Sequence, residues 1–395
     1  MTKGVTGLLL CLLALFVALG DVDNLLGSSL SIGPTHILAA LFVLSHLLLN
    51  IKDVSCFFSV DAYLLLLLVI VLAVAQAGYG STTYSMPMIN YKLVVCSVFF
   101  LVLAQHFNTY PDHVSRVLSV FMFGCVVLGL AALFVPGVGE TYKGQFIIIG
   151  ENPNSTSSRM AVAFVIALSY LLHNPEGRKE KYIACVSLIV LMVIIVKSGS
   201  RGSLLAVLLS SVLLALLAPL RRRYKVILLL AMLLGMMVLA QKLLSLDGIA
   251  ERWGSALQGD TAGRGRIWAS AFDIFMDNPW IGVGEAGYFT EIYSKEYRFI
   301  DAHNLFVYVA VCGGMVGISI LFIFLMRLFY KSYKALRIGA ALPLVLLFNM
   351  LFIAAKTGGV LTYLLLWFIF AVVSVGQVKL ADNAVYNKGG YRVGG

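Results

Sequence analysis

The sequence predicts an all-α polytopic membrane protein with about twelve transmembrane helices. Its 395 residues are 60% hydrophobic and only 12% charged, with a mean hydropathy of +0.94, whereas a soluble domain carries roughly a quarter charged residues. The apolar residues are gathered into long runs, and the basic residues into the segments between them. A water-soluble core of this size could not bury so much apolar surface, so part of it is expected to face lipid.

Twelve apolar runs set the expected order of the helices. They lie near residues 5–19, 35–49, 58–77, 89–107, 113–135, 157–173, 181–196, 202–219, 224–242, 303–327, 338–355 and 358–377. The first run lacks a small-residue cleavage site, so it is expected to be a span rather than a signal peptide. The expected organisation is therefore helices 1–9 in 1–242, a periplasmic loop with an interfacial helix in 243–302, helices 10–12 in 303–377, and a cytoplasmic tail in 378–395.

The basic residues are unevenly divided between the two sets of connecting segments. One set is expected on the cytoplasmic side, together with both termini, because positive charge is retained there. It holds more than half of the 29 basic residues, namely Lys3, Lys52, Arg116, Arg178, Lys179, Lys181, Arg221, Arg222, Arg223, Lys225, Arg327, Lys331, Lys334, Arg337, Lys379, Lys388 and Arg392. The loop at 243–302 is net acidic. The net charge of +10 thus reflects topology and attraction to membrane lipids, and indicates no nucleic-acid partner.

Several cations lie on the opposite side, where topology gives no reason for them. Arg159 follows Asn154-Ser-Thr-Ser-Ser, Arg201 follows Lys197-Ser-Gly-Ser, and Lys356-Thr-Gly-Gly opens the last run. Each is expected near the N-terminus of a span, where unsatisfied N–H groups and the helix dipole favour a cation only if an anion joins it. Hydroxyl groups and a cation at such an end favour phosphate binding. The alternative for each cation alone is a lipid headgroup or a loop carboxylate as its partner.

The long loop contains a predicted helix that begins at Arg264 and ends before Asn278-Pro279. Asp260 or Thr261 is expected to cap it, and Arg264 and Arg266 would lie in its first turn, where a bound anion is again favoured. The alternative is a helix that anchors to lipid headgroups at the membrane interface. Its apolar residues recur at helical spacing, namely Ile267, Trp268, Ala271, Phe272, Phe275 and Met276.

Two further patterns follow this helix. Gly282-Val-Gly-Glu-Ala-Gly287 fits G-x-G-x-x-G, but it follows a turn rather than a strand, so a flexible turn is expected instead of a nucleotide site. Asp301-Ala-His303-Asn304 ends the loop and opens the tenth span. A histidine beside a carboxylate can act as a general base near neutral pH. The alternative is an interfacial residue that caps its helix.

Three segments resemble the O-antigen ligase family. His303-Asn304, nine residues, and Gly314-Met-Val-Gly317 resemble its histidine motif, H-[NSQ]-x9-G-x-x-[GTY]. Arg201-Gly-Ser-Leu-Leu205 fits its R-x3-L signature, which is far less specific. Gly263-Arg264-Gly-Arg-Ile-Trp268, followed by Asn278-Pro-Trp-Ile-Gly-Val-Gly284, resembles a segment shared by ligases and polymerases of this superfamily. The spacing to Trp268 favours Arg264, rather than Arg266, as the family position.

The resemblance implies a bacterial inner-membrane glycosyltransferase with a GT-C-like fold and an active site that faces the periplasm. It would transfer O-antigen glycan from undecaprenyl diphosphate to lipid A-core in lipopolysaccharide biosynthesis, by inverting transfer without a metal or other cofactor. His303 would be the base, with Asp301 as an orienting partner, and Arg201 and Arg264 would hold the diphosphate. Further candidates for substrate or diphosphate binding are Arg159, Lys197, Arg266, Lys356 and Asn304.

Two other functions remain open at this point. A glycan polymerase would use the same lipid-linked donor. A polysaccharide-lipid transporter or flippase would place its binding site near the middle of the membrane. The candidate base in a long external loop favours an enzyme over a transporter.

Overall fold

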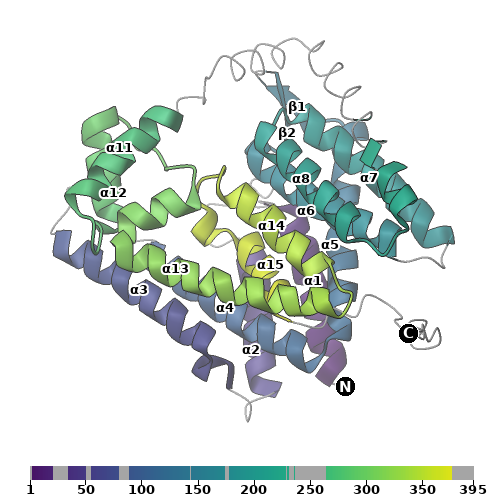
Figure 1. Cartoon of the computed structure of the whole chain (residues 1–395), viewed down its shortest axis with the longest axis horizontal. Helices are drawn as coiled ribbons and strands as arrows, with labels where there is room; N and C mark the ends of the chain where they lie inside the picture. Colours follow the sequence, from purple (N-terminus) through teal and green to yellow (C-terminus); the bar gives the residue numbers. More distant parts are fainter. Residues whose placement is uncertain are drawn as a thin grey trace, which may run out of the picture.

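The computed structural model describes residues 2–20, 34–49, 55–79, 89–142, 144–173, 178–227, 229–230, 235 and 264–375. These residues form a mainly helical fold with one small β-hairpin between α5 and α6 (Figure 1). The hairpin pairs β1 (Gly139–Tyr142) with β2 (Gln145–Ile148) in antiparallel register. The α-helices are α1 (Thr2–Leu19), α2 (Pro34–Leu49), α3 (Val60–Tyr79), α4 (Ile89–Thr109), α5 (Asp112–Phe134), α6 (Pro153–His173), α7 (Arg178–Lys197), α8 (Arg201–Leu217), α11 (Arg264–Asp277), α12 (Gly284–Glu296), α13 (Leu305–Arg337), α14 (Leu342–Ala354) and α15 (Leu364–Ser374).

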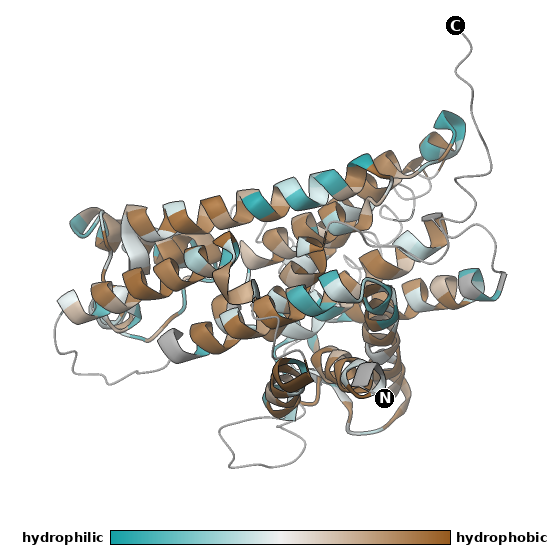
Figure 2. Cartoon of the chain, turned by 90° about the horizontal axis from the view of Figure 1, so that it is seen from below, coloured by the Kyte–Doolittle hydropathy of each residue, from teal (hydrophilic) through white to brown (hydrophobic). Residues whose placement is uncertain are grey.

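The helices of this fold are those of a multi-pass membrane protein. Within the described ranges, α3, α4, α5, α6 and α13 are long and apolar enough to cross a membrane, and α1, α2, α8, α14 and α15 are shorter apolar helices. Large apolar side chains remain exposed on the outside, such as Leu66 (56% exposed), Ile189 (65%) and Phe322 (53%). Figure 2 shows the same apolar character along most helices. Such faces are unfavourable in water and are expected to contact lipid.

Helices lie at the expected spans apart from the ninth, 224–242, most of which is outside the described residues. The total of twelve spans, the GT-C-like fold and the proposed domain boundaries therefore remain predictions. The expected cap at Asp260 or Thr261 and the tail at 378–395 also lie outside the described ranges. The hairpin after α5 was not predicted. Its two short strands lie between two apolar runs, in a segment that was expected to be a connecting loop.

Two of the differences between expected and observed helix starts change the position of a cation. α6 begins at Pro153 rather than near residue 157, since proline suits a first helical turn and the Asn152 side chain accepts a hydrogen bond from the Asn154 N–H (2.9 Å). Arg159 consequently lies beyond the first turn of the helix. At the other end of the chain, Gly359 has a φ of 65° and α15 begins only at residue 364. Lys356 therefore lies in a loop instead of at a helix N-terminus.

Helix α13 is interrupted at Gly314, where φ is 62° and ψ is −163°. The chain that follows α11 fills this break. Its Pro279 and Trp280 carbonyls accept backbone hydrogen bonds from Met315 (2.7 Å) and Val316 (3.1 Å), which replace those that the helix loses. A Cβ at Gly314 would lie 2.3 Å from the Trp280 carbonyl oxygen, so only glycine fits.

The segment from Gly282 to Gly287 is tightly packed, so the expectation of a flexible turn was wrong. A Cβ on Gly282 would lie 2.4 Å from the Val311 carbonyl oxygen, and one on Gly284 would lie 2.5 Å from the Cα of Gln76. Both glycines have positive φ values, of 78° and 67°. They allow the start of α12 to approach α3 and α13 closely, which is a packing function rather than phosphate binding.

The remaining packing places several helix ends around one region. α13 contacts α3, α14 and α15, and α11 and α12 cover its N-terminal half (Figure 1). α15 is central, because each of its residues from Leu364 to Ser374 is buried. α14 also contacts α6 and α8. The loop between α14 and α15 is thereby held close to the starts of α8, α11 and α13.

Candidate active site

A pocket of about 240 Å³ lies where the N-terminal ends of α6, α8 and α11 meet the loop after α14. Two cations, Arg264 and Lys356, contribute to its wall. Burial lowers the pKa of Arg264, and the charge of Arg201 nearby lowers it further. Cations held this close favour an anion between them. The other lining residues are Asn154, Ser200, Gly202, Ser203, Ile353 and Thr357.

Short polar side chains join the starts of α6 and α8 beside this pocket. The Ser200 hydroxyl donates to Oδ1 of Asn154 (3.0 Å) and lies 3.2 Å from the hydroxyl of Ser203. The Ser203 hydroxyl in turn lies 2.8 Å from that of Ser157. This network fixes the N-terminus of α8, and with it the backbone of Arg201, against α6.

Trp268 on α11 connects the pocket to the end of the long loop. Its ring lies 5.5 Å from the Lys356 ammonium, a distance at which cation–π attraction acts. Its indole N–H donates to the Ala302 carbonyl (2.8 Å). Because Ala302 lies between Asp301 and His303, this bond holds the candidate base close to the cations.

His303 has a φ of 50°, in the left-handed region that a residue with a side chain rarely adopts. Asp301 stabilises this turn: its Oδ1 accepts from the His303 backbone N–H (2.6 Å) and its Oδ2 from the Gly359 N–H (3.1 Å). Asp301 was expected to orient the imidazole, and its hydrogen bonds are instead with the backbone. The helix cap is Asn304, whose Oδ1 accepts from the backbone N–H groups of Phe306 (2.9 Å) and Val307 (3.2 Å).

Gly358 is a site residue that sequence reasoning missed. A Cβ there would lie 2.5 Å from Oδ1 of Asp301 and 2.7 Å from Nδ1 of His303, so the loop packs its glycine directly on this pair. The Gly358-Gly359 pair that interrupts an apolar run was the available signal. It was interpreted only as part of a helix N-terminus.

The charges of Asp301 and Arg264 act on the imidazole of His303. Burial lowers the pKa of His303 below its usual 6.5, the Asp301 charge raises it and the Arg264 charge lowers it, with a net decrease. A lowered pKa favours the neutral imidazole, the form that a general base needs. The structure thus brings Arg201, Arg264, Asp301, His303 and Lys356 into one region.

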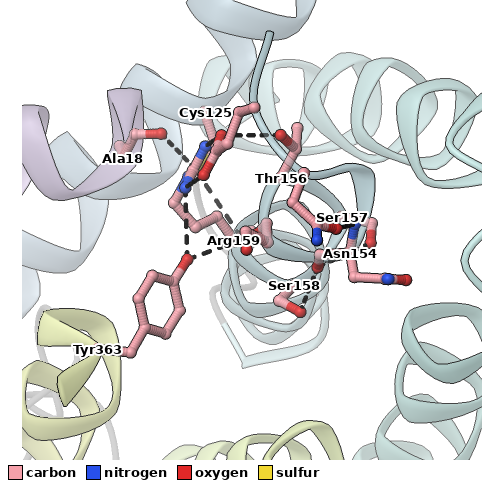
Figure 3. Close-up of polar contacts among 11 residues, drawn as sticks. Ala18, Cys125, Asn154, Thr156, Ser157, Ser158, Arg159 and Tyr363 are labelled. Carbon is pink, nitrogen blue, oxygen red and sulfur yellow. Dashed lines mark hydrogen bonds and ion pairs between the residues drawn. The ribbon is translucent and has the colours of Figure 1, made fainter. Parts of the chain in front are cut away.

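Arg159 lies outside the pocket, and a carboxylate already neutralises its positive charge. Its guanidinium forms a bidentate ion pair with Glu151 and lies 3.3 Å from the Tyr363 hydroxyl, and the side chain is 1% exposed (Figure 3). The Glu151 carboxylate also accepts from the Thr156 hydroxyl (2.8 Å). Glu151 was missed, although an acidic residue directly before an apolar run was visible in the sequence.

Two other candidate cations also have partners outside the pocket. The Lys197 ammonium lies 5.2 Å from the centre of the Phe146 ring on β2. Arg266 is 67% exposed and forms an ion pair with Glu296 on α12 (2.8 Å). Both side chains are exposed, so Lys197 and Arg266 lie at the periphery of the site.

The helix that carries Arg264 and Arg266 was predicted correctly from Arg264 to Asp277, but its buried face differs from the expected one. Ile267, Ala271 and Ile274 are buried against the neighbouring helices, whereas Phe272 and Met276 are 60% and 58% exposed. Ile274 was not included in the predicted stripe. The exposed apolar residues are compatible with a helix at the membrane interface.

Part of the chain matches a known protein family. A family model described as O-antigen ligase matches residues 186–322. The match includes Arg201, Arg264, Asp301 and His303, and it ends before the α14–α15 loop. No curated protein matches the chain. The family match indicates a membrane enzyme of the O-antigen ligase or polymerase type, whose substrates are in general lipid-linked glycans and lipid A-core.

Proposed function

We propose that this chain, whose residues 186–322 match the O-antigen ligase family model, transfers O-antigen glycan from undecaprenyl diphosphate to lipid A-core. The reaction takes place at the periplasmic face of the bacterial inner membrane. The observation that supports this proposal is that the His303 imidazole lies close enough to Arg264, and Arg264 to Arg201, for their charges to interact. A base next to cations that can hold a diphosphate is the combination that such a transfer needs.

The proposed transfer is a single inverting displacement. The acceptor hydroxyl oxygen forms a bond to the anomeric carbon of the donor glycan while the bond from that carbon to the diphosphate oxygen breaks. His303 takes the hydroxyl proton, and undecaprenyl diphosphate leaves with the bonding electron pair. Since Nδ1 of His303 lies against Gly358, we assign the proton transfer to Nε2.

Arg201 and Arg264 hold the diphosphate and stabilise the charge that develops on it. Lys356, on the same pocket wall, is a further phosphate contact in this proposal. Arg159, Lys197 and Arg266 are left out of it, because their contacts with Glu151, Phe146 and Glu296 lie outside the pocket.

Alanine at Arg201 or Arg264 tests the proposal. Each variant is expected to lower the rate of glycan transfer by about 10²–10³-fold, the effect typical of losing one group that stabilises a developing negative charge. The measurement uses purified protein, carrier-linked glycan and lipid A-core, and follows the joined product. Arg298→Ala, at an exposed cation of the same loop, is the matched control and should retain activity.

The same assay separates ligase from polymerase. A ligase forms product only when lipid A-core is added, whereas a polymerase elongates the carrier-linked glycan without it. Wild-type rates in both arginine variants would contradict the role of the pocket in donor binding.

The low pKa of His303 predicts the acidic limb of the pH profile. The base is active when neutral, so kcat/KM should fall as pH decreases, with a midpoint below 6.5. Arg264→Gln removes a charge that lowers this pKa, so the midpoint of its residual activity should move to higher pH. A wild-type midpoint above 6.5, or an unchanged midpoint in the variant, would contradict the assignment of His303 as the base.

A further inference from the structure

A second pocket, of about 250 Å³, adjoins the cationic pocket at Thr357, which lines both. Its wall includes Asp301, Asn304, Tyr308 and Leu361. We propose that this second pocket binds the acceptor sugar that carries the attacking hydroxyl, and that this sugar ring is uncharged. The assignment rests on the proposed function, because it divides donor and acceptor between the two pockets.

The position of the second pocket relative to the base supports this division. Asp301 and Asn304, in its wall, directly flank Ala302-His303 in the sequence, and Gly358, between Thr357 and Gly359, contacts the imidazole. The cationic pocket meets the same loop at Lys356 and Thr357. A sugar in the second pocket would therefore approach His303 from a different side than a diphosphate held near Arg264.

The chemistry of the wall excludes a phosphate and suits a polyol. The lining contains a carboxylate, Asp301, and no cation, so a phosphate group would be repelled. Asp301 can accept hydroxyl hydrogen bonds, and Asn304 can donate them, because its carbonyl oxygen is already used to cap α13. Leu305, Tyr308 and Leu361 form the apolar part of this wall; they are largely buried (3%, 5% and 3% exposed) and would contact only the edge of a sugar ring.

The apolar part of this wall is fixed by its neighbours. Tyr308 packs edge-on against Tyr288 with 5.6 Å between ring centroids, and Tyr288 donates to the Ile300 carbonyl (3.0 Å). The Leu361 carbonyl accepts from the indole N–H of Trp367 (2.8 Å). A pocket formed before the ligand arrives costs little ordering on binding.

Bulky substitutions in each pocket give a reciprocal test. Leu361→Trp fills the second pocket and should raise the KM for lipid A-core at least tenfold, with the donor KM changed less than twofold. Ile353→Trp, at a buried position in the cationic pocket, should do the reverse. An unchanged acceptor KM in Leu361→Trp, or an equal increase for both substrates, would overturn the assignment.

A second measurement needs no variant and so does not depend on whether tryptophan is tolerated. Wild-type protein is given acceptors whose terminal sugar is either neutral or phosphorylated on that ring. The neutral acceptor should have a kcat/KM at least tenfold higher, and equal use of both would overturn the assignment. Absence of transfer to any acceptor would refute the proposed function itself, whereas transfer with unshifted constants would refute only the division between the pockets.

Discussion

Replacement of His303 by glutamine is expected to lower the rate of glycan transfer by about 10²–10⁴-fold, the contribution of a positioned general base. Glutamine has a similar length and can still form hydrogen bonds, but it cannot take the acceptor proton. Donor binding should change little, because the proposed diphosphate contacts are Arg201 and Arg264. The loss should therefore appear in kcat, with the donor KM within about threefold of wild type.

The control for this variant is His36→Gln. His36 lies at the start of α2, a helix that contributes no residue to the wall of either pocket. Initial rates with purified protein and saturating substrates are the measurement. Wild-type kcat for His303→Gln would contradict a base at this position, as would an equal loss for His36→Gln.

Replacement of Glu151 by alanine is expected to destabilise the folded protein by about 3–5 kcal/mol, the cost of leaving one partner of a buried ion pair uncompensated. Arg159 is 1% exposed and Glu151 is 8% exposed, so water cannot readily replace the lost carboxylate. Figure 3 shows Ala18 of α1, Cys125 of α5 and Tyr363 around the Arg159 side chain. Gly20 closes this site further, since a Cβ there would lie 2.3 Å from the guanidinium nitrogen.

A double variant separates a structural role of this pair from a role in substrate binding. Glu151→Met with Arg159→Met removes both charges and should recover most of the lost stability, since replacing a whole buried pair by apolar residues is often neutral. The measurement is the free energy of unfolding in detergent, followed by transfer rates of the folded variants. A double variant that is stable but inactive would show that Arg159 contributes to substrate binding.

The sequence predicted the helical membrane fold well because its signals are local. Apolar runs, prolines and caps act within one or two turns, so the end of α11 at Asp277 was predicted correctly. The cations at the start of α8 and α11 were likewise identified from their neighbours in the chain. These signals require no knowledge of how the helices pack.

What the sequence could not predict depends on contacts between distant segments. The partner of Arg159 is decided by where α6 begins, a boundary that moved by four residues between the expected 157 and the observed Pro153. The role of Gly358 depends on α14 and α15 holding their loop against residues 301–303, which no local pattern specifies. The second pocket was missed for the same reason. Its wall combines residues 301–308, around the start of α13, with residues 357–361, in the segment between α14 and α15.

The interlocked glycines of α12 and α13 have a consequence for protein engineering. Residues 279–284 supply the hydrogen-bond acceptors that the break at Gly314 needs, and Gly314 supplies the space that the Trp280 carbonyl needs. Neither the segment 279–284 nor the chain around Gly314 would pack correctly against a partner segment of different shape. A chimaera with a related transferase should therefore exchange residues 264–317 as one cassette. A crossover inside that stretch would pair mismatched halves and shift His303, even though every proposed catalytic side chain was still present.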